Sequence, residues 1–263
     1  MILSRVARHL KQQHWTAVFI DFVIVVVGVF LGLQVQEWSK QQEDRQREKQ
    51  IVGDLLADLD IDRTQYATGL TVDMTRVSAA NASLVDAGLP AIAFDRAKPI
   101  GFDPTEPNAI VDYSFDLHEL PKIPETRFDR LWTDVVIGFF PTPSTSTYDA
   151  MAGSGDIKII RDREIVREIQ VYHNLTKSVT EQNEKLLPIR AEALKVGAIY
   201  GLAPYVNMPA KDYFRLVASE PRLAATIRIQ AMFTIYHHGE IKTADAHAAQ
   251  LQDRLRNYLK AAK

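Results

Sequence analysis

The sequence of 263 residues contains no cysteine. This absence excludes disulfide bonds and metal sites built from thiolates, although it does not identify a compartment, since many exported domains lack disulfides. A large excess of one charge is also missing, because 31 Lys and Arg stand against 33 Asp and Glu, for a net charge of -2. Domains that bind nucleic acid usually carry a basic excess. We therefore expect no nucleic-acid partner.

Sequence signatures of catalysis are scarce as well. The chain has no P-loop and no dinucleotide-binding fingerprint. Gly153-Ser154-Gly155 differs in spacing from the Gly-x-Ser-x-Gly nucleophile elbow, and we interpret it as a turn. No pair of carboxylates stands out as a general acid and a general base. We therefore predict no catalytic residue and no cofactor, and we do not expect an enzyme.

One long hydrophobic run, from Ala17 to Val35, dominates the N-terminal region. Its 19 residues include a single ionisable one, Asp21. As a helix, the run covers roughly 28 Å, which is close to the hydrocarbon thickness of a bilayer. Trp15 and Trp38 flank it, and tryptophan is enriched at membrane interfaces. We predict a transmembrane helix over residues 15–38, with the two tryptophans as interface anchors.

A buried core strand and a cleaved signal peptide are the alternatives for this run. Seven valines and two isoleucines favour a strand in water. Buried strands are usually four to eight residues long, however, and no turn residue divides this run. A signal peptide has a shorter apolar core that ends in a small-x-small cleavage site, which residues 33–37 do not offer. The run is therefore interpreted as an uncleaved anchor.

The flanking charges favour a cytoplasmic N-terminus and an exported C-terminal domain. Residues 1–14 contain three basic residues and no acidic one, whereas residues 39–50 contain four basic and three acidic residues. The basic count alone does not decide the orientation, but a long C-terminal domain crosses the membrane largely regardless of its charge. Residues 1–14 also have the pattern of a short amphipathic segment on the cytoplasmic surface.

After the anchor, the sequence predicts a charged stalk helix over residues 39–50 and an exported helical domain over residues 51–263. The stalk is polar on every side and has opposite charges at helical spacing. In the domain, apolar residues recur three, four and seven positions apart, which predicts an antiparallel helical bundle. The first such stripe consists of Val52, Leu55, Leu56, Leu59, Tyr66, Leu70, Val77 and Leu84. The predicted fold class is therefore mainly α.

Three further positions mark helix boundaries in this domain. Asp162 and Ser219 are suited to cap the starts of two later helices, because short polar side chains accept hydrogen bonds from the first free N–H groups. Pro188 predicts a kink or a break within the first of these helices.

A proline-rich excursion over residues 89–125 interrupts the helical pattern with six of the twelve prolines. Within it, apolar and polar residues alternate from Val111 to His118, which predicts a small β element. Its polar face contains Asp112, Asp116 and His118. We interpret these residues as a solvated strand face, and the alternative is a site for a divalent cation.

The C-terminal region contains a second set of possible metal ligands, His237, His238, Glu240 and His247. Of these, His237 and Glu240 have the spacing of residues on one helix face. Histidines on helix surfaces are usually solvated, and we favour that interpretation over a zinc site. The sequence therefore predicts no metal centre.

The hydrophobic run offers a stronger candidate, a helix association face. Gly28 and Gly32 form a Gly-x-x-x-Gly pair, which lets two helix backbones approach closely in lipid. Asp21 lies seven residues before Gly28 and therefore only about 20° away around the helix. An ionised carboxylate in lipid needs a partner or a proton. We expect this face to bind a second copy or another membrane protein; the alternative is that Asp21 only reaches the interface.

The segment from Asp21 to Trp38 resembles the anchor of a family of uncharacterised bacterial membrane proteins, domain-of-unknown-function family 6090. A second, looser resemblance lies in Thr147-Tyr148 through Ser154-Gly155, Ile160-Arg161-Asp162 and Tyr172-His173-Asn174. Together they cover roughly residues 1–180, and Asp21 stands where glutamate is commoner in the family. The resemblance implies a single-pass envelope protein of unassigned activity. It supplies no catalytic residues.

These observations lead to one expected function and two alternatives. We expect a membrane-tethered adaptor or scaffold in the bacterial inner membrane that acts by helix association. The first alternative is a periplasmic sensing or ligand-binding module that passes a signal to a membrane partner. The second is an exported hydrolase, which requires a clustered acid, base and nucleophile.

Overall fold

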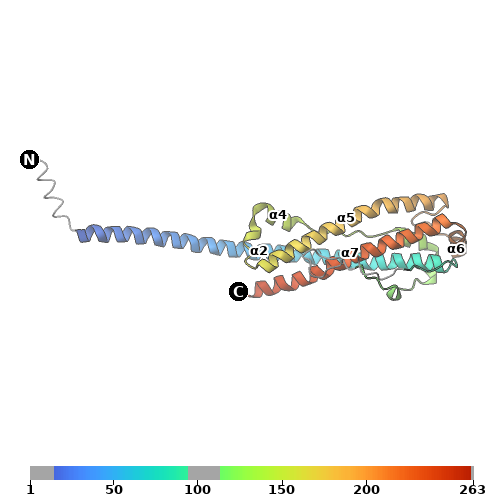
Figure 1. Ribbon diagram of the computed structural model, residues 1–263, viewed down its shortest axis with the longest axis horizontal. Coiled ribbons are helices and arrows are strands. Elements are labelled where there is room, and N and C mark those ends of the chain that lie inside the picture. Colours follow the sequence, from blue (N-terminus) through green and yellow to red (C-terminus); the bar gives the residue numbers. More distant parts are fainter. Residues whose placement is uncertain (1–14, 94–112, 262–263) are drawn as a thin grey trace, which may run out of the picture. The chain divides into compact units, whose positions relative to one another are not determined.

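The computed structural model describes residues 15–93 and 113–261. This part of the chain is mainly α-helical and contains no strand, so the predicted fold class is confirmed. The helices are α2 (Trp15–Val85), α3 (Leu131–Val136), α4 (Ser146–Ser154), α5 (Arg163–Ile199), α6 (Ala210–Ser219) and α7 (Pro221–Ala261), with short 3-10 helices at Leu117–Glu119, Glu125–Arg130 and Asp156–Lys158 (Figure 1). The predicted amphipathic segment over residues 1–14 lies outside the described residues.

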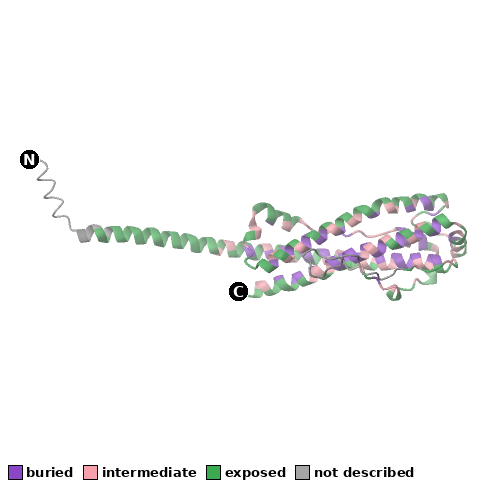
Figure 2. Ribbon diagram, viewed as in Figure 1, coloured by how far each residue is buried: buried purple, intermediate pink, exposed green. Residues whose placement is uncertain are grey.

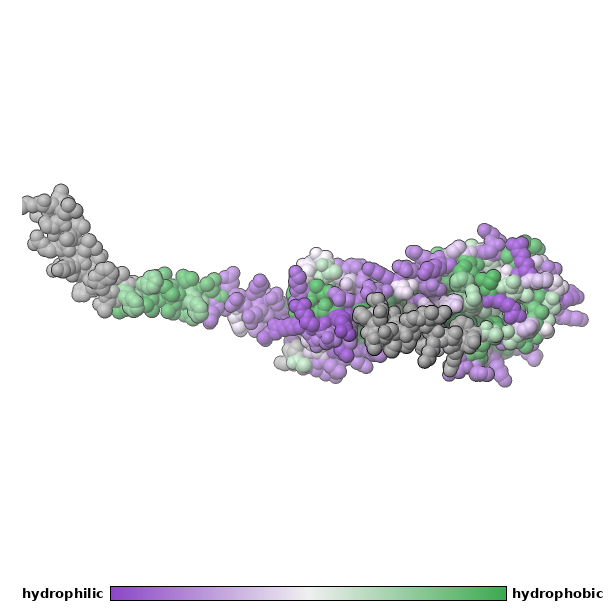
Figure 3. Space-filling model, viewed as in Figure 1, coloured by the Kyte–Doolittle hydropathy of each residue, from purple (hydrophilic) through white to green (hydrophobic). Residues whose placement is uncertain are grey.

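The chain forms two compact units, and the first is Met1–Gln50. From residue 15 onward it consists of the N-terminal part of α2. The large apolar side chains between Phe19 and Val35 are 39% to 66% exposed, so the whole run presents hydrophobic atoms outward (Figures 2 and 3). Residues 39–50, predicted as a stalk, are helical as well.

The second unit, Ile51–Lys263, is built around α2, α5 and α7 (Figure 1). One apolar cluster joins the segments 52–66 of α2, 165–179 of α5 and 241–255 of α7. A second cluster joins α2 at residues 79–84, α5 at 193–196 and α7 at 223–231. The order of these segments shows that α2 and α5 run parallel, whereas α7 runs antiparallel to both. The first predicted stripe lies inside this bundle: six of its residues are buried, and Leu56 and Leu70 pack against the core.

The ends of these helices follow from local chemistry. Gly88 has φ +76°, which favours glycine, and the Leu89 N–H closes the C-terminal turn of α2 on the Leu84 carbonyl. Asp162 caps α5 as predicted, since its side chain accepts hydrogen bonds from two N–H groups of the first turn. Pro188 neither breaks nor ends α5, which continues to Ile199. The cap predicted at Ser219 is wrong, because Ser219 is the last residue of α6 and α7 begins at Pro221.

The β element predicted after residue 110 is also wrong in its described part. Residues 113–116 have no regular structure, and a 3-10 turn follows at Leu117–Glu119. The apolar alternation still has a physical basis, because Phe115 is buried against Val77 and Ile235. Alternation alone does not form a strand, since a strand also needs a neighbouring strand to bond its backbone groups.

The segment between α3 and α4 runs along the outside of the bundle. α3 belongs to the second apolar cluster, whereas Met151 of α4 belongs to the first. Residues 137–145 cover the distance between the two clusters without helix or strand. We call residues 137–145 the strap. Its path brings it over the polar residues in the middle of the bundle.

Candidate functional site

The predicted association face lies on one continuous helix. Asp21, Gly28 and Gly32 are all in α2, and the helical register places them on one side. A Cβ atom added to either glycine would meet nothing within 4 Å. Trp38, the predicted anchor at the C-terminal end of the run, is 64% exposed. Association through this face, and the role of Trp15 as its other anchor, stay predictions.

The metal hypothesis in the proline-rich excursion gains no support from the structure. Asp112 lies outside the described residues. The Asp116 carboxylate accepts a hydrogen bond from the His118 N–H at 2.9 Å and so caps the 3-10 turn. Across the described ranges, no group of three or more His, Asp or Glu side chains is arranged to hold a metal ion.

The C-terminal histidines are not the solvated residues that the sequence predicted. His237 is completely buried, and Glu240 is 6% exposed. The Glu240 carboxylate accepts hydrogen bonds from the Tyr113 hydroxyl (2.6 Å) and the Ser178 hydroxyl (2.8 Å). His238 lies edge-on to the Phe115 ring, and burial lowers its pKa. Burial also lowers the pKa of His247.

A buried polar cluster occupies the middle of the bundle, where α2, α5 and α7 meet. We call Asp73, Arg76, Asn183, Gln230 and His237 the core cluster. His237 Nδ1 lies 2.6 Å from Asp73 Oδ2, and His237 Nε2 lies 2.9 Å from Asn183 Oδ1. Both Asp73 and His237 have fully buried side chains. Because buried ionisable groups are costly unless paired, such a cluster needs every contact that it makes.

The Arg76 guanidinium is the loosest member of the core cluster. It is 2% exposed, and its ion pair with Asp73 Oδ1 spans 3.6 Å. Its hydrogen bonds to the Val135 carbonyl and to Gln230 Oε1 are both 3.4 Å long. Burial lowers the pKa of Arg76, and Asp73 opposes that shift. The buried Arg76 guanidinium is therefore held in the bundle by long, weak contacts.

The strap covers this cluster and is fastened at three places. Asn183 Nδ2 donates to the Pro141 carbonyl at 2.7 Å, and Gln65 Oε1 accepts from the Thr142 N–H at 2.8 Å. The Ser144 N–H donates to Asp62 Oδ1 at 2.8 Å. The Phe140 ring lies edge-on to His237. A Cβ on Gly69 would lie 3.0 Å from Pro141, so this glycine leaves room for the strap.

Asp62 forms a second buried polar group with two tyrosines. The Tyr172 hydroxyl donates to Asp62 Oδ2 at 2.7 Å and lies 3.2 Å from the Tyr66 hydroxyl. Since the Tyr172 proton points to Asp62, the Tyr66 hydroxyl must donate to Tyr172. Burial raises the pKa of Asp62, and the bonds from Ser144 and Tyr172 counteract part of this shift.

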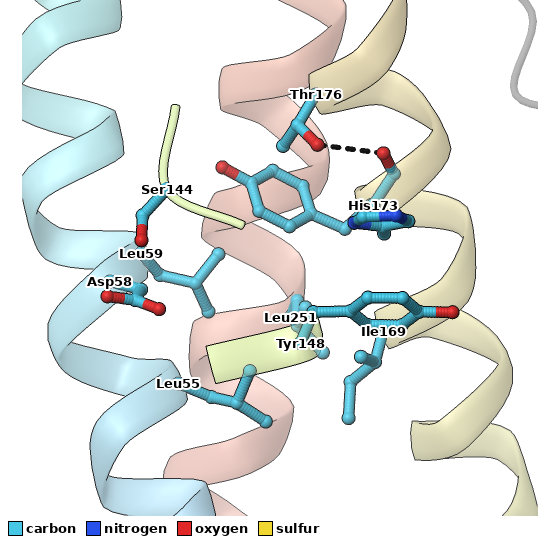
Figure 4. Close-up of a pocket in the computed structure, with 10 residues that line it drawn as sticks. Leu55, Asp58, Leu59, Ser144, Tyr148, Ile169, His173, Thr176 and Leu251 are labelled. Carbon is cyan, nitrogen blue, oxygen red and sulfur yellow. Dashed lines mark hydrogen bonds between the residues drawn. The ribbon is translucent and has the colours of Figure 1, made fainter. Parts of the chain in front are cut away.

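A small cavity lies next to Tyr172, between α2, α5, α7 and α4 (Figure 4). The rings of Tyr148 and His173 stack at its edge with centroids 3.8 Å apart, and burial lowers the pKa of His173. The cavity volume is about 20 Å³. A space of this size has room for about one water molecule, so this cavity is too small for a metabolite.

The sequence analysis missed the buried acids, although a signal for them exists. Asp62 lies three residues after Leu59 and four before Tyr66, which are both stripe positions. Asp73 has the same relation to Leu70 and Val77. A polar residue in phase with an apolar stripe is expected to be buried, and a buried acid needs partners. That reasoning identifies Asp62 and Asp73 without a structure, but it does not identify their partners on other helices.

No protein-family profile, curated protein or solved structure matches this chain.

Proposed function

We propose that this chain is a single-pass membrane protein that acts as an adaptor or scaffold through helix association. The observation that carries this proposal is the exposed apolar run from Phe19 to Val35 in α2. None of the apolar window of this helix is buried, and the helix is long and apolar enough to cross a membrane. An apolar surface of this extent, left uncovered in water, promotes aggregation, whereas in lipid it is stable.

Two features favour association as the activity. The face formed by Asp21, Gly28 and Gly32 is suited to close helix contact, and a buried acid in lipid gains from a partner. The core cluster, by contrast, lies inside the bundle, and its hydrogen bonds join its members to one another, to the strap and to α3. The proposed partners are the lipid bilayer, and either a second copy of the chain or another membrane protein.

For the location, we propose the bacterial inner membrane, with residues 1–14 in the cytoplasm and residues 51–263 in the periplasm. The segment from Asp21 to Trp38 resembles a bacterial envelope family, which supports the inner membrane. The lack of acidic residues before residue 15 supports the proposed orientation.

Labelling of introduced cysteines tests attachment and orientation together, because the chain has no cysteine of its own. Asp253→Cys is suited to the bundle, since its side chain is 79% exposed. In intact bacterial cells, a membrane-impermeant maleimide should label Asp253→Cys, whereas Ser4→Cys should react only after lysis. The reverse pattern would overturn the orientation. Release of the full chain from membranes by alkaline carbonate would overturn the anchor.

The association face is tested with paired substitutions in a bacterial reporter of transmembrane self-association. Gly28→Leu with Gly32→Leu should abolish the signal, because the larger side chains keep two backbones apart. Val25→Leu with Val29→Leu adds little bulk and is the matched control. Equal signals from the parent chain and the glycine variant would rule out a homodimer that forms through this face. In that case, crosslinking in native membranes followed by mass spectrometry should identify a different membrane protein as the partner. If it identifies none, the proposal of an adaptor is wrong.

A sensing role is the second candidate, and the core cluster is the observation that favours it. Buried ionisable groups on α2 and α7, joined to α5 through Asn183, can respond to a change in their surroundings. A hydrolase is less well supported by the same residues. In a catalytic triad the second imidazole nitrogen faces a nucleophilic hydroxyl, whereas His237 Nε2 faces the amide oxygen of Asn183. Thermal stabilisation of the purified chain by a small molecule would favour sensing over the adaptor.

A further inference from the structure

The partners of Asn183 fix the orientation of its amide. The Pro141 carbonyl only accepts hydrogen bonds, so the group 2.7 Å from it must be the Asn183 NH₂. The amide oxygen of Asn183 then faces His237 Nε2 at 2.9 Å. An oxygen acceptor in this position requires a proton on Nε2. The strap therefore determines which nitrogen of His237 carries a proton.

A second proton is required on the other side of the imidazole ring. His237 Nδ1 lies 2.6 Å from Asp73 Oδ2, which is a hydrogen-bonding distance. A neutral imidazole protonated at Nε2 would set the Nδ1 lone pair against an ionised carboxylate. The contact is favourable when a proton lies between the two atoms, as in an imidazolium paired with a carboxylate.

We propose that Asp73 and His237 form a proton-binding site whose occupancy fastens the strap to α5. When the proton on Nε2 leaves, the remaining ring proton stays on Nδ1, where it bonds to the Asp73 carboxylate, and Nε2 becomes an acceptor. Asn183 must then turn its NH₂ toward Nε2. Its amide oxygen would face the Pro141 carbonyl, and the strap would lose this bond. The strap is thus fastened at low pH and loosened at high pH.

Three other charged or ionisable groups lie around the Asp73–His237 pair. Arg76, from α2, lies 3.6 Å from Asp73 and disfavours a further cation. Arg190 of α5 interacts unfavourably with Arg76. His238 is the adjacent ionisable group on α7. The strap itself contains no ionisable residue. The Asp73 carboxylate is therefore the group that retains the proton.

Nitrogen NMR on the full chain in lipid nanodiscs, with ¹⁵N-labelled histidine, tests the site directly. The His237 signal is assigned by its loss in His237→Gln. With the strap fastened, both ring nitrogens should carry protons. As pH rises, Nε2 should lose its proton while the Thr142 and Ser144 amides lose protection from exchange by roughly fivefold or more, as expected for one lost hydrogen bond. A His237 ring protonated only at Nδ1, with the strap still protected, would overturn the proposal.

Two variants separate proton binding from a purely structural role. In Asp73→Asn, the new NH₂ can donate to Nδ1 without any extra proton, so the strap should stay fastened at every pH. In Gln65→Ala, the bond to Thr142 is lost, but the pH dependence at Ser144 should remain. If Asp73→Asn folds and keeps the pH dependence of the parent, the proton-binding site is wrong. If it does not fold, the NMR result on the parent chain decides.

Discussion

Gly197 of α5 lies directly against the indole ring of Trp132 in α3. A Cβ atom placed on Gly197 would lie 2.7 Å from Cε2 of Trp132 and closer still to Cζ2. Trp132 is 3% exposed and belongs to the second apolar cluster, so its ring has little freedom to move. This contact sets how closely α3 packs on α5, and with it the point from which the strap starts.

Gly197→Ala should therefore destabilise the bundle. The added methyl group forces either the indole or the helix backbone to shift, and such overpacking costs about 1–3 kcal/mol. The expected result is a lower urea midpoint for the full chain in detergent micelles, followed by near-ultraviolet circular dichroism. Gly53→Ala is the matched control, since its Cβ would meet nothing within 4 Å. In α2, that change should raise the stability by about 0.5–1 kcal/mol. Equal effects of the two substitutions would contradict the close contact.

Val27→Arg should impair membrane insertion. Val27 lies near the middle of the exposed apolar run. An arginine at the centre of a membrane helix costs about 2.5–3.5 kcal/mol on insertion scales. The expected outcome is a larger fraction of the chain released by alkaline carbonate. Ser39→Arg, at the start of the predicted stalk, is the control and should leave this fraction unchanged. Full retention of Val27→Arg would argue against a lipid-spanning segment.

The helical spacing of apolar residues was enough to predict the long helices, because each of them buries a regular stripe of apolar side chains. In α2, the residues Val52, Leu59, Tyr66, Val77 and Leu84 are all at most 1% exposed. The same periodicity does not determine which helices run parallel. The sequence suggested antiparallel neighbours, whereas the long return from α2 through α3, the strap and α4 makes α5 parallel to α2 (Figure 1).

The candidate site was harder to predict than the fold, because its contacts join residues far apart in the sequence. Asp73 and His237 are separated by 164 positions, and Asn183 comes from a third helix. Local spacing suggested a possible His237 and Glu240 pair, yet the two side chains bond to different partners. The strap offered no periodic signal, because its position is set by individual hydrogen bonds: its backbone N–H groups donate to Asp62 and Gln65, and Asn183 donates to its Pro141 carbonyl.

Asp62→Asn should change how stability depends on pH. Burial raises the pKa of Asp62 above 3.8, so the folded chain binds this proton more tightly than the unfolded chain does. The contribution of Asp62 to stability therefore falls as pH rises from below 3.8 through the raised pKa, and it is constant at higher pH. Asparagine does not titrate, so the variant should gain stability relative to the parent over this window.

The geometry at this position favours a folded Asp62→Asn variant. The amide oxygen can accept from the Ser144 N–H, and the NH₂ can donate to the Tyr172 hydroxyl, which can then donate to Tyr66. Asp253→Asn, at an exposed position, is the control. Urea midpoints measured at several pH values give the comparison. A constant difference between Asp62→Asn and the parent chain, from acidic to neutral pH, would show that Asp62 does not titrate as stated.

Tyr113→Phe should destabilise the fold, because it leaves Glu240 with Ser178 as its single side-chain donor among the described residues. The Tyr113 hydroxyl donates to Glu240 at 2.6 Å, and hydrogen bonds to charged groups contribute about 1.5–3 kcal/mol. The expected result is a lower urea midpoint for the full chain. Tyr205→Phe is the matched control, because Tyr205 is 75% exposed and its hydroxyl should contribute little. If both changes have the same small effect, the Tyr113 bond contributes little to the packing of residues 113–116 on α7. If only Tyr113→Phe is destabilising, this bond fixes the end of the proline-rich excursion.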